Sequence, residues 1–203
     1  MTTGWTVVIP VKDPARGKSR LAVMGVDRVA LARAIALDTI AAAAACPAVA
    51  RVVVVGDDGG LVLGALDVPH LRFVPEGDPQ GLDAAVATGM ASFERMPRAA
   101  LLGDLPALRP DDLATALALA ASVDRGVVAD AEGTGSTLVT AAAEVPWSSA
   151  FGDGSFARHV ALGCTPLDVD GSSTLRRDVD TAEQLRAART LGLGPRTAAL
   201  VGP

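Results

Sequence analysis

The stretch Arg51-Val-Val-Val-Val-Gly56 decides the fold class, because an unbroken run of valines is typical of a strand covered by other structure on both faces. Before it, residues 27–46 are rich in Ala and Leu without Gly, with Asp27 suited to begin a helix and Pro47 to follow its end. Further back, residues 6–11 form a short β-branched run that leads into a charged loop. The first quarter of the chain is therefore predicted to be strand, helix, strand.

The same alternation continues toward the C-terminus. The expected helices are residues 59–66, 82–95 and 111–122, and the expected strands are residues 70–74, 99–103 and 126–129. Strands separated by helices of this length imply parallel βαβ units, whose right-handed crossovers place helices on both faces of one sheet. The predicted fold class is therefore α/β, a three-layer Rossmann-like arrangement.

The regular alternation changes after Gly133. Residues 136–142 and 165–169 are predicted strands that flank a loop and a short helix at 155–162, and a helix at 181–191 is expected to close the chain. This order predicts a mixed, mostly parallel sheet with a partly antiparallel C-terminal half. A length of 203 residues favours a single domain over residues 1–203.

Composition excludes some classes of partner. The net charge is -5 with a pI near 5.0, whereas phosphate backbones are held mainly by basic patches, so no nucleic-acid partner is expected. Only 3% of the residues are aromatic, which removes the stacking platforms of single-strand binders. The composition leaves the oligomeric state open, and a homodimer is compatible with it.

A cytoplasmic location is expected. No apolar run approaches the roughly 18 residues that indicate a membrane span, and the N-terminal residues lack the basic and long apolar regions of a secretion signal. Cys46 and Cys164 lie far apart without a nearby His or second Cys, so we expect two buried free thiols rather than a metal site or a disulfide.

A basic loop is predicted after the first strand. Lys12, Arg16, Lys18 and Arg20 lie within nine residues of one another in an acidic protein, which favours binding of a triphosphate over a merely solvated loop. Gly17-Lys-Ser19 resembles part of a P-loop, but that motif requires Gly at position 12, where this chain has Lys. No G-x-G-x-x-G follows the strand either, so a dinucleotide dehydrogenase is not expected.

Three aspartates are candidates for a Mg²⁺ site. Asp104 directly follows the predicted strand 99–103, where ligands bind in open α/β sheets, and Asp178 and Asp180 immediately precede the last predicted helix. Mg²⁺ prefers oxygen ligands and usually takes one or two carboxylates together with substrate phosphates. The other interpretation of Asp178 and Asp180 is that they cap the helix, although Thr181 can do so as well.

Two glycine-rich segments are candidates for an anion pocket. Gly133-Thr-Gly-Ser-Thr137 and Phe151-Gly-Asp-Gly-Ser155 let backbone N–H groups approach an anion, and the second segment begins a predicted helix. The alternative is two ordinary turns with Ser155 as a helix cap. His159 lies one helical turn after Ser155 and is a secondary candidate, with a core or surface histidine as the alternative.

Taken together, these motifs resemble the guanylyltransferases of coenzyme F-420 biosynthesis, which act on 2-phospho-L-lactate or phosphoenolpyruvate. The resemblance covers nearly the whole chain and depends on the order and spacing of short motifs. The motifs are Ile9-Pro-Val-Lys12, Lys18-Ser-Arg-Leu21, Gly81-Leu82, Gly103-Asp-Leu-Pro106, Gly133-Thr-Gly-Ser-Thr137, Phe151-Gly-Asp-Gly-Ser155 and Asp178-Val-Asp-Thr181.

The resemblance implies a fold of the nucleotide-diphospho-sugar transferase type. It also implies that GTP and a three-carbon phosphate acid give a GMP-linked diphosphate and pyrophosphate, with Mg²⁺ as cofactor. By motif match, Thr137, Gly152 and Ser155 would hold the acceptor acid. Asp104 and Asp178 would hold Mg²⁺, with Asp180 a close alternative.

On the nucleotide side, the resemblance assigns Gly81, Leu82 and Asp83 to contacts with GTP. The family usually has Asn at position 83, and its Asp-rich turn corresponds here to Gly56-Asp-Asp58, to which we give no role. An acceptor phosphate is already an anionic nucleophile, so no Ser-His-Asp relay is required. Lys12, Lys18 and Arg20 are the expected catalytic residues, opposing charge that moves toward pyrophosphate.

Two other functions remain open on the sequence alone. A related nucleotidyltransferase acting on molybdopterin or a sugar phosphate would carry a Gly-rich loop with Arg and Lys after its first strand, where this chain has Pro10-Val-Lys12. A non-catalytic GTP-binding module of the same fold is the second alternative.

Overall fold

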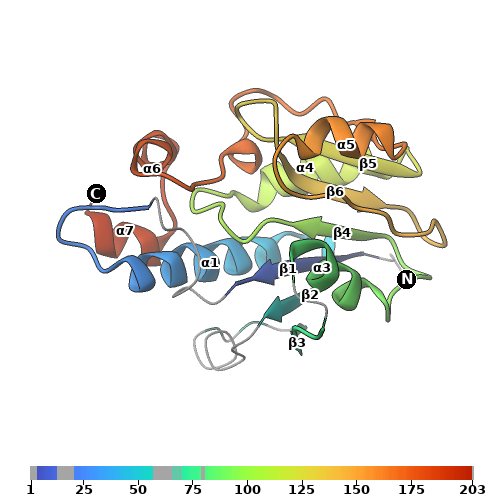
Figure 1. Cartoon of the computed structure of the whole chain (residues 1–203), viewed down its shortest axis with the longest axis horizontal. Helices are drawn as coiled ribbons and strands as arrows, with labels where there is room; N and C mark the ends of the chain where they lie inside the picture. Colours follow the sequence, from blue (N-terminus) through green and yellow to red (C-terminus); the bar gives the residue numbers. More distant parts are fainter. Residues whose placement is uncertain are drawn as a thin grey trace.

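The computed structural model describes residues 4–12, 21–56, 66, 68, 70–78 and 81–202 (Figure 1). The strands are β1 (Trp5–Val11), β2 (Val49–Gly56), β3 (Leu71–Pro75), β4 (Arg98–Leu101), β5 (Arg125–Ala129), β6 (Ser136–Ala141) and β7 (Thr165–Pro166). The helices are α1 (Arg28–Ala45), α3 (Leu82–Met90), α4 (Pro110–Ala120), α5 (Ser155–Ala161), α6 (Ala182–Arg189), α7 (Pro195–Val201) and the 3₁₀ helix η1 (Thr174–Arg176).

The seven strands form one sheet in the order β3-β2-β1-β4-β6-β5-β7. Strand β6 is antiparallel to both of its neighbours, β4 and β5, and the other pairs in the sheet are parallel. The predicted mixed and mostly parallel sheet is therefore confirmed. Because β6 runs in the opposite direction, its first residue lies beside the C-terminal ends of the neighbouring strands.

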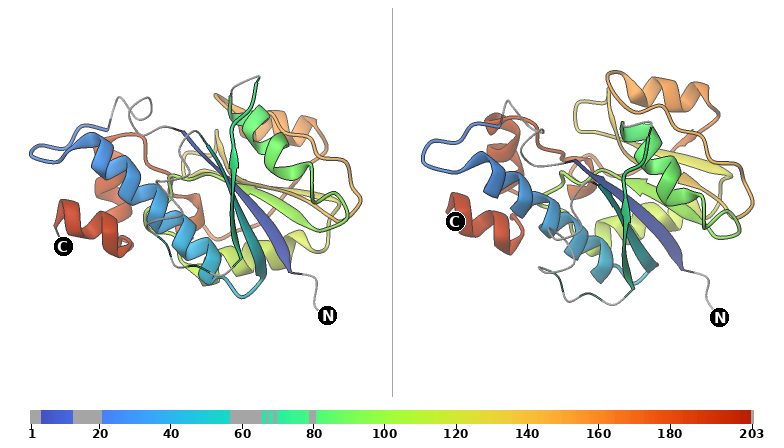
Figure 2. Two further views of the ribbon diagram at one scale, coloured as in Figure 1. Left: turned by 90° about the horizontal axis from the view of Figure 1, so that it is seen from below. Right: turned by 60° about the horizontal axis from the view of Figure 1, so that its bottom comes forward.

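Helices cover both faces of this sheet (Figure 2). In β1, Val7 and Ile9 point toward the face that packs against α1 and α4, whereas Val8 points toward the face covered by α3. The four consecutive valines of β2, Val52–Val55, alternate in the same way and are nearly inaccessible to solvent. The valine run was therefore correctly interpreted as a strand covered on both faces, and the three-layer prediction is confirmed.

Helix α3 lies unusually close to the sheet at Gly89. A Cβ atom at this position would lie 2.5 Å from a methyl carbon of Val8 and 2.9 Å from one of Val55. The helix ends at Met90, before the predicted end at residue 95, and the chain then turns toward β4 with Phe93 N–H bonded to the Met90 carbonyl.

Local capping signals give the helix starts that the sequence predicted. Asp27 caps α1 by accepting a hydrogen bond from Ala30 N–H at 2.7 Å. Thr181 caps α6 in a capping box with Gln184, so the interpretation of Asp178 or Asp180 as the cap is wrong. Ser155 is the first residue of α5 and makes no capping bond, and Gly154 occupies the cap position.

Two predictions for the C-terminal part are wrong. The strand expected at residues 165–169 pairs over only two residues as β7, because the chain turns away after Leu167 N–H bonds to the Val127 carbonyl, and Val169 N–H then bonds to the Leu167 carbonyl. The helix at 181–191, observed as α6, does not close the chain, since α7 follows it. Helix α7 is anchored to α1 by the buried Asp38, which accepts hydrogen bonds from Thr197 N–H at 2.7 Å and Arg196 N–H at 3.2 Å.

The helix expected at residues 59–66 lies outside the described residues except for Leu66. None of the helices in the described part of the chain combines the length and the apolar character that crossing a membrane requires. Cys46 and Cys164 are both buried and free, as predicted.

Candidate functional site

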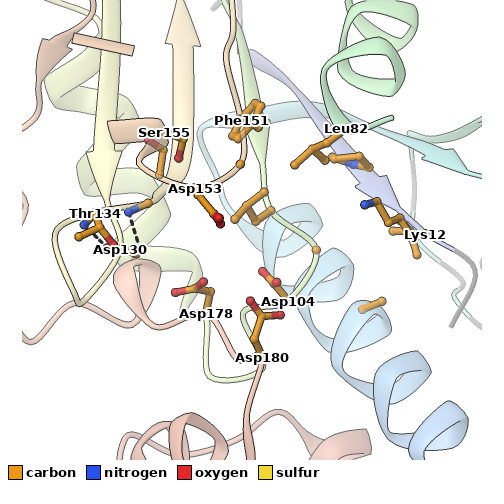
Figure 3. A pocket seen from close by; sticks show the side chains of 18 of the residues that line it. Lys12, Leu82, Asp104, Asp130, Thr134, Phe151, Asp153, Ser155, Asp178 and Asp180 are labelled. Atoms are coloured by element: carbon orange, nitrogen blue, oxygen red, sulfur yellow. Dashed lines mark hydrogen bonds between the residues drawn. The ribbon is translucent and has the colours of Figure 1, made fainter. Parts of the chain in front are cut away.

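A cleft with a volume of about 520 Å³ opens at the C-terminal ends of the parallel strands. Its walls come from the segments that follow β1, β4 and β5, from the start of β6, from the loop before α5 and from the segment before α6 (Figure 3). Pro10, Leu102, Asp130 and Ser136 each mark the end or the beginning of a strand at this edge. The cleft is thus in the position where open α/β sheets bind ligands.

Three carboxylates meet on one wall of the cleft. Asp104, Asp178 and Asp180 each offer an oxygen atom within 4.8 Å of the others, and Figure 3 shows the three groups pointing toward one another. The two segments are joined by a hydrogen bond from Val179 N–H to the Asp104 carbonyl at 3.0 Å. The structure therefore brings together the three aspartates that the sequence selected, and their role as metal ligands stays a prediction.

The side chain of Thr39 supports the segment that carries Asp104. The buried Thr39 hydroxyl donates to the Ile35 carbonyl within α1 at 2.9 Å and accepts a hydrogen bond from Leu105 N–H at 3.1 Å. This contact ties the segment after β4 to the middle of a long helix. The position of Asp104 therefore depends on a residue 65 positions earlier in the chain.

Asp178 is the electrostatic centre of the cluster. Burial raises its pKa to about 7, and the neighbouring carboxylates of Asp104, Asp130 and Asp180 raise it as well. Its Oδ1 atom is buried and has no hydrogen-bond partner among the described residues. A cation between these oxygens would supply the charge that the cluster lacks, and hard oxygen donors suit Mg²⁺. The donor set therefore fits this metal.

A second acidic group, Asp130, Glu132 and Asp178, also brings its oxygens within 4.8 Å of one another. In this group, however, both carboxylate oxygens of Asp130 accept backbone hydrogen bonds, from Thr134 at 2.9 Å and Gly135 at 2.7 Å. Asp130 therefore fixes the turn between β5 and β6. The first group of aspartates is the better candidate for a metal.

The glycine-rich loop before α5 forms the opposite wall. Gly152 and Gly154 have φ values of 107° and 66°, conformations that favour glycine, and Ser155 begins the helix with only 2% of its surface exposed. Figure 3 shows Ser155 and Asp153 on this loop, facing the side of the carboxylates. The arrangement places an anion-suited loop across the cleft from the candidate metal site.

These observations can be compared with known proteins. Residues 5–187 match the family described as "Guanylyl transferase CofC like". The chain belongs to this family.

Relatives from the guanylyl transferase family match nearly the whole chain. A phosphoenolpyruvate guanylyltransferase from Thermomonospora curvata is 51% identical over 97% of this chain and 88% of its own length. One from Streptomyces coelicolor is 48% identical over 97% of this chain and 95% of its own. The high identity over both lengths agrees with the resemblance inferred from the motifs.

More distant solved structures share the fold. A nucleotidyl transferase from a Methanothermobacter species has a TM-score of 0.60 and 18% identity, covering 93% of this chain and 97% of its own. A 4-diphosphocytidyl-2C-methyl-D-erythritol synthase has a TM-score of 0.63 and 15% identity, covering 94% of this chain and 99% of its own. At these identities, the likeness concerns the fold, and it confirms the predicted nucleotidyltransferase architecture.

The other residues expected to bind ligands in this guanylyl transferase differ in whether they line the cleft. Lys12 and Leu82 line the cleft, whereas Lys18 and Arg20 lie outside the described residues. Gly81 caps α3 with a φ of 133° and donates its N–H to the Glu76 carboxylate at 2.9 Å. The contacts of these residues with a nucleotide stay predictions.

Thr137 and Asp83 have surroundings that the sequence did not indicate. Thr137 is fully buried in β6, and its hydroxyl has no hydrogen-bond partner among the described residues, while the preceding Ser136 lines the cleft. Asp83 accepts hydrogen bonds from Ser149 Oγ at 2.7 Å and Phe151 N–H at 3.1 Å. Binding of the acceptor by Thr137 and of the nucleotide by Asp83 are likewise predictions.

Sequence reasoning did not select Asp130, although it lines the cleft and raises the pKa of Asp178. The signal was available, because Asp130 directly follows the predicted strand 126–129 just as Asp104 follows its own strand.

Proposed function

We propose that this protein transfers GMP from GTP to phosphoenolpyruvate, or to 2-phospho-L-lactate, and releases pyrophosphate in coenzyme F-420 biosynthesis. The observation that carries the proposal is the 51% identity, over nearly the full chain, to a protein named phosphoenolpyruvate guanylyltransferase. The geometry supports it, because one cleft combines three carboxylates with a glycine-rich loop. The substrates are small molecules in the cytoplasm, with neither nucleic acid nor a membrane as partner.

Asp104, Asp178 and Asp180 would hold Mg²⁺, which when bound neutralises charge on the triphosphate. Gly81 and Leu82, at the start of α3, would contact the nucleotide. Thus the carboxylate wall and α3 would orient GTP so that its α-phosphorus faces the loop of Gly152.

On the acceptor side, backbone N–H groups between Gly152 and Gly154, together with Ser155, would bind the phosphate acid, with Thr137 behind them in β6. A phosphate oxygen of the acceptor attacks the α-phosphorus of GTP, and the bond from this phosphorus to the bridging oxygen of pyrophosphate breaks. Lys12, with Lys18 and Arg20, would oppose the charge that moves to the leaving pyrophosphate. No protein base is required, because the attacking oxygen is already ionised.

The test measures pyrophosphate release from GTP with phosphoenolpyruvate and with 2-phospho-L-lactate, with and without Mg²⁺. We expect turnover with at least one acid, loss of turnover when EDTA removes the metal, and weaker activity with other nucleoside triphosphates. Release with neither acid would refute the proposal. Turnover with a sugar phosphate or with molybdopterin would assign the protein to another branch of the fold.

The variant Asp104→Asn separates catalysis from nucleotide binding. We expect turnover to fall by a factor of about 100 or more, because a metal contribution of several kcal/mol is lost, while GTP binding stays detectable by calorimetry. The control Asp124→Asn removes an exposed carboxylate at the opposite end of β5 and should keep full activity. Unchanged turnover in Asp104→Asn would contradict the metal role, and GTP binding by an inactive wild type would favour a non-catalytic module.

A further inference from the structure

The segment that leads into the glycine-rich loop is held by side chains rather than by secondary structure. Ala150 and Phe151 lie between β6 and α5, outside any helix or strand. Ala150 N–H bonds to the His159 ring at 2.9 Å and Phe151 N–H to Asp83 Oδ1 at 3.1 Å. Both carbonyls accept from Arg158, at 3.1 Å for Ala150 and 2.9 Å for Phe151. Three side chains therefore satisfy all four backbone polar groups of this dipeptide.

His159 connects this segment to the start of β6. Its Nε2 accepts from Ala150 N–H, and its Nδ1 lies 2.9 Å from Ser136 Oγ at the start of β6. Because a backbone N–H can only donate, Nε2 must be unprotonated, so the neutral ring carries its proton on Nδ1 and donates it to Ser136. The ring thus joins Ser136, which lines the cleft, to the segment before Gly152.

The surroundings of His159 keep it in this neutral form. The side chain is fully buried, and Phe151 contacts the ring edge-on with the ring centroids 4.9 Å apart. Burial lowers the pKa of His159, the carboxylate of Asp83 on α3 acts in the opposite direction, and the guanidinium of Arg158 on α5 lowers it further. The imidazole that accepts from Ala150 is therefore the form present at neutral pH.

We propose that His159 is a positioning residue for the acceptor pocket, acting with Asp83 and Arg158 to fix Ala150 and Phe151 in front of the glycine-rich loop. This inference rests on the proposed function, in which that loop binds the phosphate acid. Phe151 and Gly152 both line the cleft, so a shift of the segment changes the pocket directly. Asp83 directly follows Leu82, which also lines the cleft.

The proposal differs from a simple core role in what it predicts for kinetics. A histidine with only a core role affects stability and lowers the apparent kcat through the amount of folded enzyme, and it leaves both KM values unchanged. A positioning residue for the acceptor pocket affects the KM of the acid and leaves the KM of GTP nearly unchanged. The test therefore measures both KM values and kcat for matched variants.

His159→Phe keeps an aromatic ring and removes both hydrogen bonds, whereas His159→Gln can still accept from Ala150 N–H through its amide oxygen. We expect His159→Phe to raise the KM of phosphoenolpyruvate at least about 10-fold, because a buried N–H group loses its partner and the pocket loses its alignment. His159→Gln should recover much of this loss. The KM of GTP should change less than about 2-fold in both variants.

Two further variants test the proposal without depending on whether the His159 variants fold. Arg158→Lys changes an exposed side chain, keeps its charge and removes the paired contact to the two carbonyls, so it should raise the acceptor KM without loss of structure. His70→Asn changes the other histidine, which is exposed and has a φ of 63° that Asn tolerates, so it should have no effect.

The outcomes separate this inference from the proposed function. If the wild type releases no pyrophosphate with any three-carbon phosphate acid, the proposed function is overturned. If the wild type is active, and if Arg158→Lys and folded His159→Phe have the same KM for the acid as the wild type, only the positioning role is overturned. Equal increases in the KM of GTP and of the acid would also overturn it, because they indicate that the whole site is distorted and not the acceptor pocket in particular.

Discussion

The cluster of Asp104, Asp178 and Asp180 should destabilise the metal-free protein through charge repulsion and burial, and Asp178→Asn should remove part of this cost. Asp178 has a pKa of about 7 in the folded chain against an ordinary value of 3.8, so the folded state resists its ionisation. A difference of about 3 pKa units corresponds to at most about 4 kcal/mol, since one unit is worth about 1.4 kcal/mol. Because the side chain keeps partial contact with water, we expect about 2 kcal/mol.

The sign of the effect sets its pH dependence. Below pH 3.8 the carboxyl is protonated in both states, and the substitution should have little effect. Between 3.8 and about 7 the unfolded chain loses the proton first, so the cost to the wild type grows with pH and is complete above 7. The gain in stability from Asp178→Asn should therefore be largest at pH 8 and less than half as large at pH 5.

Urea unfolding in EDTA measures this gain. With a slope of about 2 kcal/mol per molar urea, the midpoint of Asp178→Asn should lie about 1 M above that of the wild type at pH 8. The control Asp124→Asn changes the net charge equally at an exposed position and should shift stability by less than about 0.5 kcal/mol. Added Mg²⁺ should stabilise the wild type and not the variant. A variant no more stable than the wild type at pH 8, or equally stabilised at pH 5, would refute the reasoning.

Two further predictions concern the supports of the site. Thr39→Val should lower the free energy of unfolding in urea by about 1 to 3 kcal/mol, because Leu105 N–H loses its buried partner. The control Thr115→Val removes a side-chain hydrogen bond on the exposed face of α4 and should have little effect. Equal effects of the two substitutions would contradict this account. The His159 pKa should lie below 6.5, so the contribution of His159 to stability is complete above pH 6.5 and falls at lower pH. NMR titration of the His70→Asn variant, in which His159 is the one histidine left, measures this pKa. A value above 6.5 would contradict the prediction.

Local sequence signals predicted the parts of the fold that depend on local physics. The valines of β2 alternate between two apolar layers, and the caps Asp27 and Thr181 start their helices with their own side chains. Helix α7 escaped prediction because it is short and its anchor is Asp38, a residue almost 160 positions earlier in the chain. β7 was predicted too long because its own residues do not indicate where the chain leaves β5, which happens after the bond from Leu167 N–H to the Val127 carbonyl.

The same division applies to the site. Asp104, Asp178 and Asp180 could be predicted because strand ends and helix starts meet at one edge of a parallel sheet. The sequence could not decide whether Ser136 or Thr137 faces the cleft, because neighbouring residues of a strand point to opposite faces and a shift of one residue exchanges them. Nor could it show that Asp83 and His159 bind backbone groups of the same segment, since the three regions are distant in sequence.

The reversed direction of β6 has a consequence for how this fold can diversify. A connection between two neighbouring parallel strands must run back to the opposite end of the sheet, whereas β5 and β6 are antiparallel and are joined by a tight turn that lies in the cleft. The turn is closed by Asp130, whose carboxylate accepts hydrogen bonds from Thr134 N–H and Gly135 N–H. Insertions or exchanges in these few residues can therefore reshape one wall of the pocket while the sheet stays intact, which makes the turn a natural place for changes in acceptor preference.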